Sequence, residues 1–126
     1  MASVIVCDND EQKTLSHVEA LRANGYAVVT SQRFNDALRE NEQDECQLLV
    51  LGLEAVKVED ERLWGLVEKL AQRMPVIGLH DHPSEDICQA AARAHIAAVL
   101  SRAASREVFM YAVEQLLRQK TVAVNC

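Results

Sequence analysis

The chain has 126 residues, of which 49% are hydrophobic and 25% are charged, a size and balance typical of one compact domain with a single core. Its formal net charge is -6 and its pI is about 5.2, which argues against a nucleic-acid-binding face. No apolar run approaches the roughly 20 residues that cross a bilayer, and no basic segment followed by an apolar stretch opens the sequence. We therefore expect a cytoplasmic domain that neither enters a membrane nor binds nucleic acid directly.

Short apolar runs alternate with amphipathic stretches, the pattern of a parallel sheet covered by helices. The first half of the chain predicts strands over 4–7, 27–30 and 48–51, and helices over 11–23 and around Phe34, Ala37 and Leu38. In the helix over 11–23, the apolar stripe is Leu15, Val18 and Leu21, and Gly25 supplies the C-terminal stop.

The second half predicts helices over 60–73, from 84 to 94 and from Ser105 onward, and strands over 76–79 and 98–100. Trp64 is expected to pack on the helix over 60–73 rather than to serve as a binding anchor. Ser105 is the expected N-cap of the last helix, whose inward residues are Val108, Phe109, Ala112, Val113, Leu116 and Leu117. We assign residues 1–120 to one domain and 121–126 (TVAVNC) to a tail or the start of a linker to an output domain.

Five β-α units with right-handed crossovers predict a three-layer, doubly wound α/β fold. Its sheet is expected to be five-stranded and parallel, with the flavodoxin-like order 2-1-3-4-5. Ligands of such sheets bind at the C-terminal ends of the strands, beside the switch point between the first and third strands. The residues at these positions are Asp8, Asn9, Asp10, Gly52, His80, Asp81, His82, Ser101 and Arg102.

The blocks VIVCDND, LLVLGL, PVIGLHD and AAVLSRA make the chain resemble a response-regulator receiver domain of the CheY-like type. The resemblance implies a phosphoryl-accepting aspartate at the end of the third strand and Mg²⁺ held by acidic residues after the first strand. It also implies a serine or threonine at the end of the fourth strand and a lysine at the end of the fifth.

The chain departs from this pattern at most of these positions. Asp8 matches the first acidic position, but Asn9 occupies the second, Gly52 stands at the acceptor position, His80 replaces the hydroxyl residue and Arg102 replaces the lysine. Glycine has no nucleophilic oxygen, and Mg²⁺ requires hard anionic oxygens. We therefore expect a degenerate receiver that is not phosphorylated in the usual way, with no catalytic residue, no enzymatic activity and no cofactor.

Two other uses of this site stay open. Glu54 lies two residues past Gly52 and could point the same way as an alternative acceptor, although we expect it in a loop several ångströms from the pocket. Two carboxylates and two imidazoles could instead converge on a transition metal, the candidates being Asp8, Asp10, His80 and His82. The interpretation we favour is that Asp8 pairs with Arg102 while His80 fills the volume of the phosphorylated site.

In receiver domains, the face made by the fourth helix, fifth strand and fifth helix mediates dimers or contacts with an output domain. Here that face would draw on Gln89, Arg93, Arg102, Tyr111, Glu114, Gln115 and Arg118. We therefore expect phosphorylation-independent regulation by protein contact, with itself as a homodimer and with an output domain or partner protein. The resemblance points to the N-terminal domain of a sigma-54-dependent transcriptional activator of the flagellar or biofilm type. The alternatives are a small-molecule or metal sensor and a phospho-receiver with an unusual acceptor.

Overall fold

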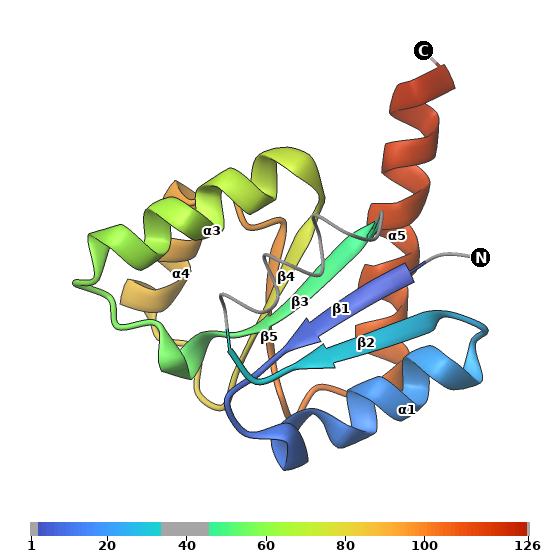
Figure 1. The fold of residues 1–126 in the computed structure, drawn as a ribbon, viewed down its shortest axis with the longest axis horizontal. Coiled ribbons are helices and arrows are strands. Elements are labelled where there is room, and N and C mark those ends of the chain that lie inside the picture. The colour runs from blue at the N-terminus through green and yellow to red at the C-terminus, as the bar shows by residue number, and fades with distance from the viewer. Residues whose placement is uncertain (1–2, 34–45, 126) are drawn as a thin grey trace.

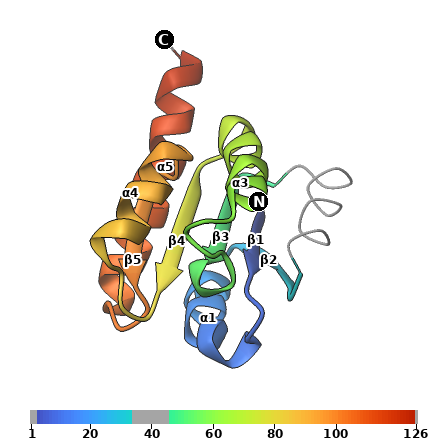
Figure 2. The same ribbon diagram turned by 90° about the vertical axis from the view of Figure 1, so that its left-hand side faces the viewer.

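The computed structural model of the protein describes residues 3–33 and 46–125. These residues form a five-stranded parallel sheet in the order β2-β1-β3-β4-β5, which confirms the predicted order (Figures 1 and 2). The strands are β1 (Ser3–Cys7), β2 (Ala27–Ser31), β3 (Leu48–Gly52), β4 (Val76–His80) and β5 (Ala98–Ser101). The helices are α1 (Leu15–Ala23), α3 (Glu61–Arg73), α4 (Glu85–Arg93) and α5 (Arg106–Asn125), with short 3-10 turns η1 (Glu11–Thr14) and η2 (Leu53–Ala55). The helix predicted around Phe34, Ala37 and Leu38 lies outside the described residues.

Alternate side chains of the central strands point to opposite faces of the sheet and build two apolar layers. Ile5, Leu49 and Leu51 pack on one face in a cluster with α3 and α4. Val4 and Val50 pack on the other face with α1 and α5. Figure 1 shows these two helix pairs on opposite sides of the sheet. Since each fully buried side chain of this size contributes about 1.5–3 kcal/mol, the two layers fix the strand ends from which the site is built.

Local capping interactions set the ends of the helices. The Asp60 carboxylate accepts a hydrogen bond from the Leu63 N–H at the start of α3, and the Ser84 hydroxyl accepts one from Ile87 at the start of α4. The Ser105 hydroxyl accepts from the Val108 N–H at 3.2 Å, so the predicted N-cap of α5 is confirmed. After α1, Gly25 adopts a φ of 88°, the left-handed conformation that stops the helix.

Two apolar residues expected to face inward are exposed instead. Leu15 is 56% exposed and Val108 is 49% exposed. The buried face of α1 includes Leu21, and at 3.6 residues per turn Leu15 lies about a third of a turn around the helix from it. In α5 the i, i+4 pair Phe109 and Val113 defines the buried stripe, and Val108 lies one residue off it.

The structure buries one histidine that the apolar pattern did not reveal. His17 of α1 packs edge-to-face against Phe109 of α5, with ring centroids 4.8 Å apart and an interplanar angle of 81°. Burial, together with the charge of Arg102, lowers the pKa of His17. The imidazole therefore acts as a neutral aromatic spacer between the two helices.

The last helix continues through residues 121–125, so the segment assigned to a tail begins as helix and projects beyond the sheet (Figure 1). Within the described ranges, no helix is both long enough and apolar enough to span a bilayer.

Candidate functional site

The C-terminal ends of the strands bring the predicted site residues to one edge of the sheet. The parallel register places Cys7 beside Leu51, and it places Gly52 beside Leu79. Asp8 therefore follows β1 directly next to the end of β3. Arg102 follows β5, and its N–H donates to the carbonyl of His80 at 3.1 Å. These connections bring together side chains from three separate parts of the chain.

Asp8 and Arg102 form a buried ion pair across this edge. Arg102 Nη2 lies 2.5 Å from Asp8 Oδ2, and the two side chains are only 7% and 2% exposed. The other carboxylate oxygen of Asp8 accepts a hydrogen bond from the Asp10 N–H at 3.0 Å. The contact that the sequence suggested is therefore present, and each charge compensates the burial of the other.

Glu54 binds the same guanidinium, contrary to the expectation that it would lie several ångströms away. Arg102 donates from Nη2 to Glu54 Oε1 at 2.6 Å and from Nε to Glu54 Oε2 at 3.1 Å. The Asp81 N–H also donates to Glu54 Oε2 at 2.8 Å. The sequence placed Glu54 in an open loop, but the 3-10 turn η2 begins immediately after Gly52 and keeps Glu54 close to the strand end.

The electrostatics follow from this bidentate contact. Burial raises the pKa of Glu54, but the hydrogen bonds from Arg102 and from the Asp81 N–H outweigh burial and lower the pKa to about 2. Burial lowers the pKa of Arg102, and the hydrogen bonds to Glu54 and Asp8 outweigh it and raise the pKa above its ordinary value. Both groups therefore stay charged across the physiological range.

A second cation completes the network at the rim. Asp81 Oδ1 lies 3.4 Å from Arg102 Nε, and Lys13 Nζ lies 2.9 Å from Asp81 Oδ2. Lys13 and Asp81 are 41% and 40% exposed, so this outer pair contributes little to stability. We call the set of Asp8, Glu54, Asp81, Arg102 and Lys13 the ion-paired site.

Gly52 lies directly under the ion pair, and the space above its Cα is already occupied. A Cβ at this position would lie 2.6 Å from Asp8 Cγ and 2.8 Å from Arg102 Nη2, and closer still to Asp8 Oδ2. Real Cβ atoms essentially never approach other heavy atoms this closely. Residue 52 therefore has no side-chain oxygen, and any side chain there would require Asp8 and Arg102 to shift.

The remaining predicted residues make local contacts. Asn9 is exposed, and the Asp10 carboxylate caps η1 by accepting from the Gln12 N–H at 3.1 Å. His80 Nδ1 accepts from the N–H of exposed His82 at 3.0 Å. In the part of the chain that the structure describes, no three His, Cys, Asp or Glu side chains are grouped so that they could hold a metal ion.

The residues proposed for an interface differ in how far their side chains are exposed. Gln89, Arg93, Tyr111 and Arg118 are exposed, and Glu114 and Gln115 are half-buried. Arg102 was also counted among them, but its side chain is 7% exposed and held in the ion-paired site. Arg102 is therefore not available as a surface contact. Its side chain instead connects the end of β5 to the ion-paired site.

Solved structures similar to this chain include receiver domains. A response regulator from Thermotoga maritima matches with a TM-score of 0.81 and 15% identity, covering 94% of this chain and 98% of that one. A CheY-like receiver domain protein from Methanospirillum hungatei matches with a TM-score of 0.82 and 17% identity, covering 98% of both chains. The receiver domain of an HD-domain protein from Pseudomonas fluorescens gives a TM-score of 0.82 at 16% identity, covering 96% and 98%. At these identities the likeness establishes the fold.

Among curated proteins, the transcriptional regulatory protein GlrR of Escherichia coli K12 is 25% identical over 105 residues. The transcriptional regulatory protein QseF of Escherichia coli O157:H7 is similar to the same extent. The matched region is 83% of this chain and 24% of either relative, so the chain spans about a quarter of the relatives' length. No protein-family model matches the chain.

Proposed function

We propose that this chain, which has the fold of a response-regulator receiver domain, regulates by protein contact and without phosphorylation. Its most natural place is the N-terminal regulatory part of a bacterial transcriptional regulator in the cytoplasm, of the sigma-54-dependent type. The similarity to about a quarter of two proteins named as transcriptional regulators supports this placement. In this proposal the domain catalyses no reaction and needs no cofactor.

The observation that carries the proposal is the filled space above Gly52. A phosphoryl acceptor must present an oxygen in line with the leaving group, and Asp8 and Arg102 occupy the volume where that side chain would begin. The guanidinium of Arg102 also pairs with Asp8 and Glu54. It thereby offsets part of the negative charge that would otherwise attract Mg²⁺. The space in which an acceptor side chain would begin is therefore filled by side chains of the domain itself.

A phosphorylation assay tests this directly. The domain is incubated with Mg²⁺ and acetyl phosphate, or with beryllofluoride, and is followed by intact mass spectrometry and by amide chemical shifts. We expect no adduct and no shift change, while a receiver that carries the acceptor aspartate reacts in parallel. A stable adduct on this domain contradicts the proposal.

The position of Glu54 supports a second candidate function, a phospho-receiver with an unusual acceptor. Its carboxylate lies inside the site rather than in a distant loop, 2.6 Å from Arg102 Nη2. To accept a phosphoryl group, Glu54 would have to release at least one of its two contacts with Arg102. Peptide mapping of an adduct to Glu54, and its loss in Glu54→Gln, would favour this candidate over the first.

A further inference from the structure

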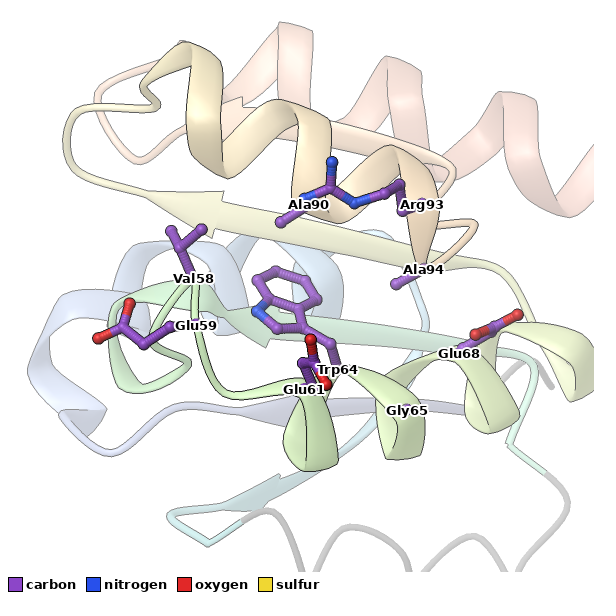
Figure 3. Close-up of a pocket in the computed structure, with 9 residues that line it drawn as sticks. All are labelled: Val58, Glu59, Glu61, Trp64, Gly65, Glu68, Ala90, Arg93 and Ala94. Atoms are coloured by element: carbon purple, nitrogen blue, oxygen red, sulfur yellow. The ribbon is translucent and has the colours of Figure 1, made fainter.

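A groove with a volume of about 450 Å³ lies between α3 and α4, and no residue of the ion-paired site lines it. Trp64 of α3 and Ala90 and Ala94 of α4 provide its apolar floor (Figure 3). Trp64 is 8% exposed, and its Nε1–H donates to the Lys57 carbonyl at 3.0 Å. This hydrogen bond satisfies the polar edge of the indole, so the ring is held in place as a rigid wall.

The rim of the groove is acidic. Glu59, Glu61 and Glu68 line it from the α3 side, and Arg93 reaches in from α4 (Figure 3). Three carboxylates against one guanidinium leave an excess of negative charge around an aromatic ring, even though the His95 imidazole lies 3.8 Å from Glu68. A lysine or arginine side chain matches this arrangement, because its aliphatic stem packs on apolar surface while its charged head meets carboxylates or the face of the indole.

Gly65 keeps this groove open. A glycine in the interior of a helix is unfavourable relative to alanine, and the packing does not require one here, since a Cβ at residue 65 would meet no atom within 4 Å. The open space that replaces a side chain is part of the groove lining. Any longer side chain at this position would extend into the groove.

We propose that the α3–α4 groove binds a basic peptide segment of a partner protein, which inserts one lysine or arginine side chain against Trp64. Charge complementarity selects this occupant, because acidic peptides and anionic ligands would meet three glutamates. The proposal extends regulation by protein contact to a groove that shares only Arg93 with the predicted α4–β5–α5 face, and it does not depend on the state of the ion-paired site.

The test uses intrinsic fluorescence, because Trp64 is the one tryptophan in the chain. The domain is titrated with a short acetylated and amidated peptide of alternating lysine and leucine, and with the same peptide carrying glutamate for lysine. We expect a saturable signal for the lysine peptide alone, with a Kd of about 10–500 µM, as for a small interface. Equal binding of the two peptides, or no binding of the lysine peptide, overturns the proposal. The assay contains no phosphoryl donor, so its failure is distinct from failure of the proposed function.

Variants locate the binding site. Gly65→Leu should abolish binding, and Glu61→Gln with Glu68→Gln should weaken it at least about fivefold, while Arg93→Gln should tighten it because a like charge is removed. Glu107→Gln, an exposed carboxylate on α5, is the matched control and should bind as the parent chain does. Circular dichroism verifies that each variant folds. Unchanged binding by folded Gly65→Leu contradicts the proposal, as does a change in oligomeric state that shows a second copy in the groove.

Discussion

At the scale of single residues, the Asp8 and Arg102 side chains that pack over residue 52 disfavour any residue larger than glycine there. Adding a Cβ forces Asp8 and Arg102 to move, and overpacking of this kind costs about 1–3 kcal/mol. We expect Gly52→Asp to lower the free energy of unfolding by that amount in urea denaturation and to leave the domain unreactive toward acetyl phosphate. Gly52→Ala should lose nearly as much, because the crowding begins at the Cβ. Parent-like stability of Gly52→Ala would show that the ion pair moves aside freely.

The Asp8–Arg102 pair is expected to couple strongly. Arg102→Ala leaves the Asp8 carboxylate, 2% exposed, without its countercharge, which typically costs about 3–5 kcal/mol. Asp8→Ala removes the other partner, and the double variant should cost less than the sum of the two single changes. A double-mutant cycle in urea measures this coupling. Simple additivity of the two costs would mean that the pair contributes no interaction energy.

Glu54 should make stability depend on acid pH. Its pKa lies at about 2 in the folded chain, below the ordinary value of 4.5, so the unfolded chain binds more protons between these values. The contribution is fully present above about pH 4.5 and is lost as the pH falls toward about 2. The side chain is 24% exposed, and solvent screening reduces the effect to about 1–2 kcal/mol.

The measurement compares unfolding free energies of the parent chain and Glu54→Gln from about pH 6 downward. The difference between them should shrink as the pH falls through the acid range. A difference that is constant with pH would assign the effect to packing rather than to the charge of Glu54.

At the scale of elements, α3 contains an interior glycine that makes the helix less stable than it could be. Gly65 lies inside this helix and a Cβ there would meet nothing within 4 Å. We expect Gly65→Ala to stabilise the domain by about 0.5–1 kcal/mol, because alanine loses less backbone entropy on helix formation. Thermal unfolding measures this gain. Gly25→Ala is a control that should destabilise the domain, because φ at Gly25 is 88° and alanine is strained in that conformation. Destabilisation by Gly65→Ala would mean that α3 packs more closely than its open face indicates.

The elements were more predictable from the sequence than the contacts of their side chains. Apolar runs and right-handed crossovers were enough to predict the strand order. The positions of Asp8 after β1 and of Arg102 after β5 were enough to predict that their side chains pair. Glu54 was misplaced because a three-residue turn has no apolar period to reveal it. The crowding above Gly52 depends on how far Arg102 extends, and the groove beside Trp64 depends on the spacing of two helices. These are tertiary distances that no local pattern encodes.

At the scale of the whole molecule, self-association through α4, β5 and α5 stays a prediction. Tyr111 is 66% exposed on this face, and a buried aromatic residue is a common anchor of interfaces. If the domain forms this homodimer, Tyr111→Glu should shift it toward monomer in size-exclusion chromatography with light scattering. Leu15→Glu is the matched control, because Leu15 is 56% exposed on α1, outside this face. Equal effects of the two substitutions, or none, would contradict the predicted face.

The occupied space above Gly52 also has an evolutionary consequence. For some glycine codons, a single nucleotide change gives an aspartate codon, so the genetic code itself sets only a low barrier to an acceptor carboxylate. In this protein that step places the new side chain against Asp8 and Arg102, so both must shift before a carboxylate fits at residue 52. A working acceptor at residue 52 therefore requires accompanying changes at the positions that now fill this space.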